Sequence, residues 1–192
     1  MGASVWWKYE TDRRAAEEAA RQAAWDAEHA ERPVHLSVVA PNYDSGATRI
    51  PLRVKGTDLD GQSVEETYYV NADTPEIGLR KGDYQVTVVA SPILWAGGLY
   101  AVPSEPVALE VGDAPAGPDQ DAQSVQTVEV ELTAIDDPTT ITDEQIAAAR
   151  AAAEADPDSG QAAKAGPYAE AATKRRDDAV AAKRAAGGDG RG

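Results

Sequence analysis

The sequence predicts a mainly β protein with helical flanks: an antiparallel Greek-key β-sandwich of about seven strands, an N-terminal helix and a C-terminal helical hairpin. The division of the chain into three regions of different composition predicts this fold. Residues 15–31 are rich in Ala, Glu and Arg and lack Gly and Pro, whereas residues 33–137 form short Val, Thr, Tyr and Leu runs between turn residues. Residues from 142 onward are again Ala-rich and charged. The expected division is an Ala-rich helical segment (1–32), a sandwich domain (33–137) and a helical segment with a flexible Gly-rich end (138–192).

Composition excludes several classes of function. The 192 residues carry 18 Lys and Arg against 33 Asp and Glu, a formal net charge of -15, which repels phosphate backbones, so no nucleic-acid partner is expected. Cysteine is absent, which excludes disulfides, thiolate metal sites and cysteine nucleophiles. No apolar run approaches the roughly 20 residues that span a bilayer.

The first helix carries a stripe of small side chains. Alanine recurs every four residues from Ala15 to Ala27, and residues spaced by four share a helix face. The stripe indicates either close approach to a partner helix or simply the high helix propensity of alanine, and both interpretations stay open. Pro33 is expected to end the helix, because the residue before a proline avoids helical backbone angles.

An aromatic cluster precedes this stripe. Trp6, Trp7 and Tyr9 flank Lys8, and two arginines follow. Trp and Tyr concentrate at membrane–water interfaces with basic residues just beyond them. One interpretation is therefore that residues 1–32 are a juxtamembrane segment next to a spanning segment, which would make the protein extracytoplasmic and membrane-anchored at its N-terminus in the cell envelope. The alternative is that Trp6 and Trp7 pack against the sandwich.

Seven runs between residues 33 and 137 have the composition of strands. They are short, apolar or alternating, and bounded by Gly, Pro, Asn or Asp. Pro51 lies in the second run and cannot donate a ladder hydrogen bond, which predicts an edge strand or a bulge. The runs are 34–40, 49–55, 64–70, 83–91, 99–102, 106–111 and 125–135. Residues 112–123 are expected to form a mobile loop.

A short motif within these runs resembles the transthyretin-like sandwiches. Leu79, Gly82, Tyr84 and Val86 follow the Leu-x-x-Gly-x-Tyr-x-Val pattern of Cna protein B-type and carboxypeptidase regulatory-like domains, and the resemblance extends roughly over residues 33–111. The glycine permits a positive φ at a corner, and the tyrosine can bury its ring while its hydroxyl bonds to the backbone. The resemblance implies a non-catalytic structural or adhesive module of bacterial surface proteins.

One property of that family is not expected here. Some Cna B-type domains carry a Lys–Asn crosslink promoted by an acid. Lys55 is a candidate lysine, but the chain holds only Asn42 and Asn71, and the last strand run contains no asparagine.

The C-terminal segment opens with a helix start signal. Thr142 and Gln145 form a capping box with acids in the first turn. A first helix is expected up to residue 155, where a Pro- and Gly-containing break follows, and a second from about 166 to 186. Its narrow Ala-rich face predicts docking on the first helix or on the sandwich. A partly disordered tail is the alternative.

The search for catalytic residues finds no convergent set. His29 and His35 are the only imidazoles and are expected to be solvated or structural. The chain lacks a nucleophile elbow, a phosphate loop and a zinc-protease motif, and Asp58, Asp60 and Gly61 lack the further acids of a calcium loop. No catalytic residue, metal site or cofactor is therefore expected, and the protein is not expected to be an enzyme; a hydrolase is the least favoured alternative.

An apolar segment supplies the candidate ligand site. Leu94, Trp95 and Tyr100 surround a Gly-Gly turn, and an exposed Trp95 could stack on a sugar or anchor a partner. The other interpretation is that Leu94 and Trp95 cap the sandwich core. The predicted function is a non-catalytic, envelope-associated structural or protein-interaction module. A glycan-recognition domain that uses this loop is the alternative, so the expected partner is an unidentified protein or glycan.

Overall fold

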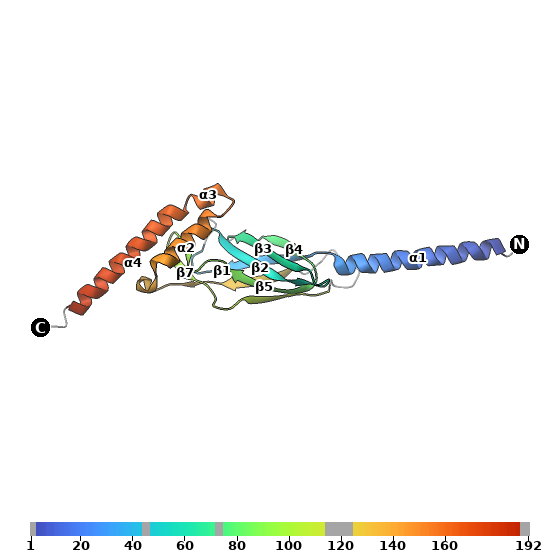
Figure 1. Cartoon of the computed structure of the whole chain (residues 1–192), viewed down its shortest axis with the longest axis horizontal. Coiled ribbons are helices and arrows are strands. Elements are labelled where there is room, and N and C mark those ends of the chain that lie inside the picture. The colour runs from blue at the N-terminus through green and yellow to red at the C-terminus, as the bar shows by residue number, and fades with distance from the viewer. Residues whose placement is uncertain (1–2, 44–46, 72–74, 114–124, 189–192) are drawn as a thin grey trace.

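The protein is long, with a helix projecting from one end of a β body and further helices covering the other end (Figure 1). The computed structural model describes residues 3–43, 47–71, 75–113 and 125–188. The projecting helix is α1 (Ala3–His29), and the C-terminal helices are α2 (Asp143–Glu154), α3 (Ser159–Ala162) and α4 (Ala165–Gly188), preceded by the 3-10 turn η1 (Pro138–Thr140). The predicted mobile loop, apart from residues 112 and 113, and the end of the Gly-rich tail lie outside the described residues.

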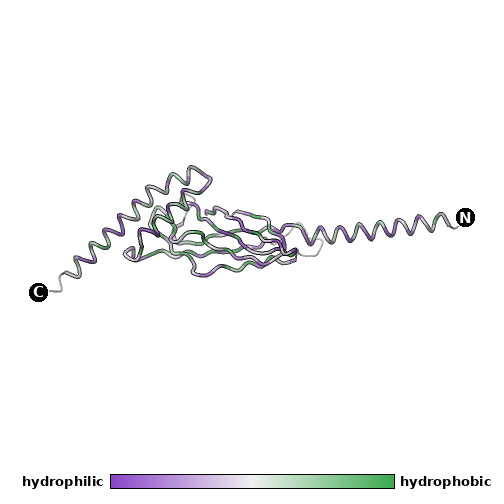
Figure 2. The backbone as a smooth tube through the Cα atoms, viewed as in Figure 1, coloured by the Kyte–Doolittle hydropathy of each residue, from purple (hydrophilic) through white to green (hydrophobic). Residues whose placement is uncertain are grey.

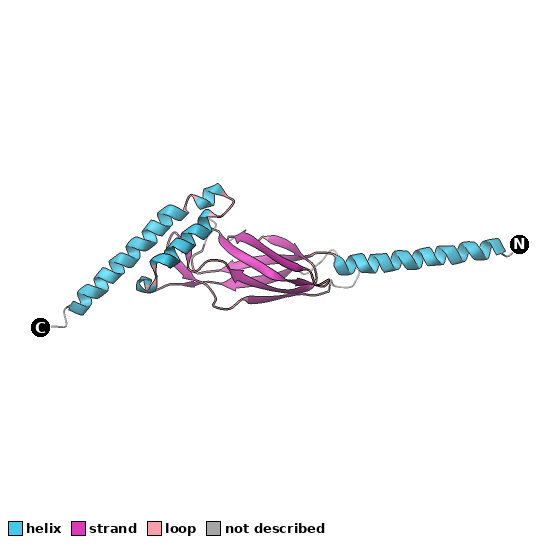
Figure 3. Ribbon diagram, viewed as in Figure 1, coloured by secondary structure: helices cyan, strands magenta, loops and turns pink. Residues whose placement is uncertain are grey.

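Ten strands in three sheets make up the described β body (Figure 3). The first sheet has the order β4 (Glu76–Leu79), β1 (Arg32–Val39), β9 (Gln126–Glu131). The second has the order β3 (Ser63–Val70), β2 (Ile50–Asp58), β5 (Gly82–Val88), β8 (Val107–Val111). The third has the order β10 (Thr133–Ala134), β7 (Gly98–Ala101), β6 (Ile93–Trp95).

The predicted β body with helical flanks is confirmed in its coarse form, as a mixed α/β fold. The number of strands and their arrangement differ from the prediction. There are ten described strands rather than about seven, and β1 pairs with β9 in parallel rather than antiparallel. The extra strands β4, β6 and β10 have two to four residues each, too few for an alternating pattern. Over the described residues the sheets do not close into a barrel.

One hydrophobic core lies between the first and second sheets. Along the strands alternate residues are buried, as the two-residue period of a strand requires, so each sheet turns one row of side chains inward. Residues of the first two sheets in this core include Val34, Leu36, Leu52, Val54, Tyr84, Val86, Leu109, Val111, Val128 and Val130.

Pro51 shows a second difference from the prediction. It belongs to β2, which is a central strand rather than an edge strand. The register between β2 and β5 begins one residue later, at Leu52, and Pro51 takes part there only as an acceptor, from the N–H of Val89 at 2.9 Å.

The corner around Tyr84 confirms one half of the motif argument and corrects the other. The Tyr84 ring is 3% exposed, and its hydroxyl donates a hydrogen bond to the carbonyl oxygen of Arg80 at 2.8 Å. Gly82 has no positive φ. A Cβ at Gly82 would instead lie 2.3 Å from the carbonyl oxygen of Thr57, and one at Gly56 would lie 2.2 Å from that of Asp83. The glycines thus allow β2 and β5 to approach closely.

The C-terminal helices dock on the body, at the β6–β7 hairpin. The capping box is present, with the Gln145 N–H donating to the Thr142 hydroxyl at 3.2 Å and the Thr142 N–H donating to the Gln145 side chain at 3.0 Å. A second core fills the space between the hairpin, η1, α2 and α4. It contains Leu94, Leu99, Ile141, Ile146, Ala149, Ala169 and Ala172. The hairpin of helices is therefore an integral part of the fold rather than a disordered tail.

α1 occupies most of the expected helical segment (1–32) and projects from the body. It begins at Ala3, so the aromatic cluster belongs to the helix, and no residue from Val5 to Glu28 is buried. Trp6, Trp7 and Tyr9 are 63%, 67% and 69% exposed and lie at the end remote from the body, so they do not pack against it (Figure 1). Figure 2 shows polar residues interspersed along the whole of α1.

Candidate functional site

The predicted ligand site is a tight β-hairpin. β6 and β7 pair so that Trp95 lies opposite Gly98, with Ala96 and Gly97 in the turn between them. A Cβ at Gly97 would lie 2.1 Å from the Trp95 ring, because the indole folds back over the turn. Only a glycine at this position leaves room for that indole.

The indole continues into a cluster of three aromatic rings. Trp95 stacks on Tyr100 with a centroid separation of 5.0 Å and an interplanar angle of 19°. Tyr43 meets Tyr100 edge-on at 6.3 Å. Tyr100 is fully buried, and its hydroxyl donates to the carbonyl oxygen of Pro41. Stacked and edge-on pairs of this kind stabilise a core, so the rings serve packing first.

The three predicted site residues are brought together, but two of them lie inside the protein. Leu94 is 1% exposed and belongs to the second core, where the Thr48 hydroxyl donates to its carbonyl oxygen. Tyr100 has no exposed surface, and Trp95 alone is partly exposed. A ligand at the surface can therefore reach only Trp95, which corrects the expectation of an exposed aromatic loop.

α4 covers the hairpin turn from outside. The Arg175 guanidinium donates to the carbonyl oxygen of Ala96 at 3.2 Å, and it lies beside Gly98. No local pattern in the sequence links Arg175 to a residue 79 positions away.

A long-range ion pair fixes the same helices to β2. The Arg49 guanidinium donates to both carboxylate oxygens of Asp156, at 2.7 Å to one of them, and the Asp156 side chain is 1% exposed. The pair with Asp156 raises the pKa of Arg49. Asp156 lies in the Pro- and Gly-containing break after α2, and no local pattern links it to Arg49, since 107 residues separate the partners.

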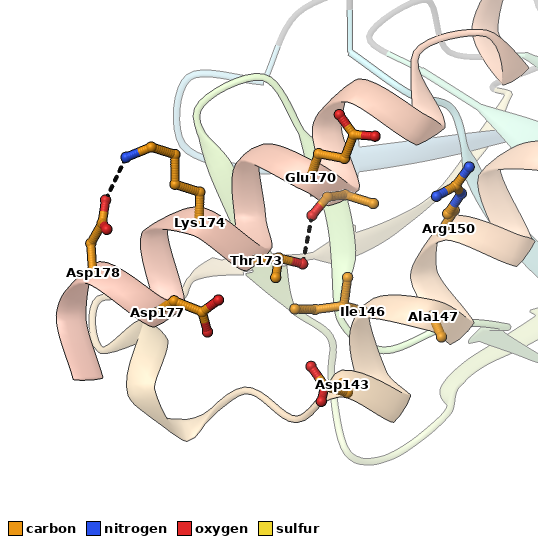
Figure 4. A pocket seen from close by; sticks show the side chains of 10 residues that line it. Asp143, Ile146, Ala147, Arg150, Glu170, Thr173, Lys174, Asp177 and Asp178 are labelled. Atoms are coloured by element: carbon orange, nitrogen blue, oxygen red, sulfur yellow. Dashed lines mark hydrogen bonds and ion pairs between the residues drawn. The ribbon is translucent and has the colours of Figure 1, made fainter. Parts of the chain in front are cut away.

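A surface groove of about 590 Å³ lies between α2 and α4 (Figure 4). Its lining residues are Asp143, Ile146, Ala147, Arg150, Ala169, Glu170, Thr173, Lys174, Asp177 and Asp178. Both cations that line it are paired with acids: Arg150 with Glu154 and Lys174 with Asp178, each at 2.7 Å. The groove offers neither an unpaired cation nor a nucleophile beside a base.

The two histidines lie in separate places. His29, near the end of α1, stacks on Trp25 at 3.9 Å, and its Nε2 lies 3.1 Å from a carboxylate oxygen of Asp60. A hydrogen bond to the Trp25 carbonyl, with a smaller effect of Asp60, raises the pKa of His29. His35 pairs with Glu76 at 3.1 Å on an exposed face of β1. Across the described ranges, no three His, Asp or Glu side chains gather as a metal site requires.

Two further findings bear on function. No protein-family model matches this chain, and no curated protein matches it either. Among the helices described here, none has the length and apolar character to cross a bilayer.

Proposed function

We propose that the protein is a non-catalytic, envelope-associated structural or protein-interaction module that binds through α1. The observation that carries this proposal is the exposure of that helix. At 1.5 Å per residue, 27 residues extend about 40 Å. Isolated helices are marginally stable in water, and exposed aromatic patches mark interaction sites. A projecting helix that exposes Val5, Trp6, Trp7, Tyr9 and Trp25 is therefore suited to binding.

The body is proposed to be a transthyretin-like Greek-key sandwich. Seven strands of the two larger sheets share one core, and Tyr84 makes the backbone hydrogen bond expected of the motif. The parallel β1–β9 pair and the additional third sheet are departures from the predicted seven-stranded antiparallel arrangement. Within the family, such domains act as spacers or adhesive units, which agrees with the lack of a convergent catalytic set among the described residues.

The N-terminal end of α1 is proposed to lie at a membrane, outside the cytoplasm. Its support is the exposure of Trp6, Trp7 and Tyr9 around Lys8, at the end farthest from the body (Figure 1). Aromatic rings with a basic neighbour suit the headgroup region of a bilayer, where the ring is partly dehydrated and the charge stays solvated.

Vesicle binding tests this proposal. The full chain should co-sediment with vesicles that contain anionic lipid, and Trp6→Ala/Trp7→Ala should weaken binding at least about tenfold, because each removed indole forfeits about 1.5 kcal/mol or more of burial. Trp25→Ala is the control, since Trp25 is exposed on the same helix but near the body. Equal binding by the control and the double variant, or no binding by the wild-type chain, would contradict the membrane assignment.

A glycan-recognition domain is the alternative proposal, and it is supported by Trp95 alone. The partly exposed indole and the glycine turn that holds it are the features that favour it. Saturating oligosaccharide should then change Trp fluorescence in the wild-type chain but not in Trp95→Leu. An unchanged spectrum with a panel of oligosaccharides would remove this alternative.

A further inference from the structure

α1 has no partner along its length within the described protein. Its links to the body are at its C-terminal end, where His29 contacts Asp60 and the Arg32 guanidinium caps the helix by donating to the carbonyl oxygens of Ala27, Glu28 and Ala30. Of the seven large hydrophobic residues exposed in the described structure, five belong to α1. In proteins most helical stability comes from packing one face, which favours a second surface for α1.

One face of α1 is apolar over the whole helix. Residues separated by three, four or seven positions share a face. The stripe comprises Val5, Tyr9, Ala16, Ala20, Ala23 and Ala27, and it is hereafter called the α1 stripe. Asp12 is the one charged residue that falls within it. None of these side chains is buried.

We propose that the α1 stripe binds the same stripe of a second copy, in antiparallel orientation, to form a dimer. Size complementarity supports this orientation. When the pair is centred on Ala16, Tyr9 lies opposite Ala23 of the second copy and Val5 lies opposite its Ala27, since the members of each pair are equally far from Ala16. Large side chains thus meet small ones on both halves, and the same contact is made twice, as a two-fold interface requires.

Charges beside the stripe also match in this orientation. On one flank Arg13 comes within about 3 Å, measured along the axis, of the level of Glu17 of the second copy. On the other flank Lys8 has the same offset of about 3 Å from Asp26 of the second copy. Each pair joins opposite charges and occurs twice. Flanking ion pairs of this kind set the orientation of helix pairs.

A parallel pair is disfavoured by the charge of the two halves. Residues 3–16 carry three cations and two anions, net +1, whereas residues 17–29 carry one cation and four anions, net -3. A parallel pair places the two acidic halves together, whereas the antiparallel pair places each beside a basic half. The antiparallel pair also keeps the two strongly acidic bodies at opposite ends of the paired helices, about 40 Å apart. This distance reduces the electrostatic repulsion between the bodies.

The pair has a consequence for the envelope proposal. The two N-terminal ends lie at opposite ends of the two-helix rod, so membrane contact at both would hold the rod parallel to the surface. Self-association in solution is independent of any membrane, so its failure would leave the vesicle result unaffected.

Sedimentation equilibrium of the full chain tests the dimer. The wild-type protein should show a concentration-dependent monomer–dimer equilibrium. Ala16→Glu should weaken it at least about tenfold, because a carboxylate buried without a partner costs more than about 1.4 kcal/mol. Ala15→Glu is the matched control. It adds the same charge at the adjacent position, but Ala15 lies about 100° around the helix from Ala16 and therefore outside the α1 stripe. Asp12→Ala should tighten the dimer by removing the charge from the stripe.

Orientation is tested by disulfide trapping, which the cysteine-free chain permits. Mixed Tyr9→Cys and Ala23→Cys proteins should crosslink to each other faster than Ala23→Cys crosslinks to itself. Since α1 packs on no other helix or strand that the structure describes, these variants should leave the thermal unfolding of the body unchanged. A monomer at all concentrations, equal effects of the two glutamates, assemblies that grow beyond a dimer, or faster self-crosslinking of Ala23→Cys would overturn the proposal.

Discussion

At the scale of single residues, Tyr84 links the motif in the sequence to the packing of the core. Its ring fills the space beneath the β4–β5 corner, and its hydroxyl satisfies the Arg80 carbonyl. The same burial raises the pKa of Tyr84. The position therefore combines apolar contact with one hydrogen bond, which neither Phe nor a polar residue would reproduce.

Tyr84→Phe should reduce the free energy of unfolding by about 1 kcal/mol, because it removes one hydrogen bond and keeps the ring. Urea denaturation measures the loss. Tyr69→Phe is the control, since Tyr69 is half-buried and its ring lies 5.9 Å from the Arg49 guanidinium, a contact that the substitution retains. Equal losses in both variants would show that the Tyr84 hydroxyl has no special role.

Asp156 is the second residue on which packing depends. Asp156→Ala should destabilise the protein by about 3 kcal/mol or more, because it leaves Arg49 partly buried without its counter-charge. Asp158→Ala, two residues away on an exposed side chain, should cost clearly less. Chemical denaturation of both variants decides the matter. A loss no larger for Asp156 than for Asp158 would show that the pair does not hold the helices to β2.

At the scale of elements, the end of α1 contains a pH-sensitive contact. Protonated His29 donates from Nδ1 to the Trp25 carbonyl and from Nε2 to Asp60, which Arg80 also approaches, at 3.9 Å. Because the folded-state pKa of His29 is raised, the contact is fully present below the ordinary histidine pKa of about 6.5 and is lost as pH rises through the higher folded value.

NMR titration of the His29 ring should report a pKa above about 6.5 in the wild-type chain. Asp60→Asn should lower that pKa, since it removes an anion but retains a hydrogen-bond acceptor. Glu76→Gln is the control, because Glu76 pairs with His35 instead. A His29 pKa unaffected by Asp60→Asn would mean that the α1 end and the β2–β3 turn are not coupled in solution.

The sequence predicted elements better than their contacts. The capping box at Thr142, the Ala stripe of α1 and the core strand that carries Tyr84 all follow from residue spacing within a few turns of chain. A helical segment is expected within residues 1–32 and α1 occupies 3–29, but the exposure of its aromatic residues does not follow from spacing. The parallel β1–β9 pair has no local signal.

At the candidate site, too, the sequence indicates the local structure but not the long-range contacts. Proximity of Leu94, Trp95 and Tyr100 follows from a hairpin with a glycine turn, which the sequence indicates. Their burial does not, because it depends on distant parts of the chain: Leu94 packs against α2 and α4, whereas Tyr100 lies in the core of the β body. The exposure of an aromatic side chain depends on its neighbours in the tertiary structure. The spacing of residues in the sequence does not predict those neighbours.

At the scale of the whole molecule, the two ends of the chain differ in their relation to the body. The C-terminal helices share a core with the β6–β7 hairpin, and Asp156 pairs with β2. Among the described residues, α1 shares no core with the body and contacts it at its C-terminal end, through His29. The proposed function depends on this difference between the two ends. A helix that does not contribute to the stability of the body has its whole surface available to a partner.

Urea unfolding of two truncated chains tests that asymmetry most directly. Deleting residues 1–30 should leave the unfolding free energy of the body within about 0.5 kcal/mol of the full chain, since surface changes away from packed features have effects of that size. Deleting residues 138–192 should cost several kcal/mol, because exposing Leu94 and Leu99 forfeits about 1.5 kcal/mol or more for each and Arg49 loses its partner. A large loss on removing α1, or none on removing the C-terminal helices, would contradict the account.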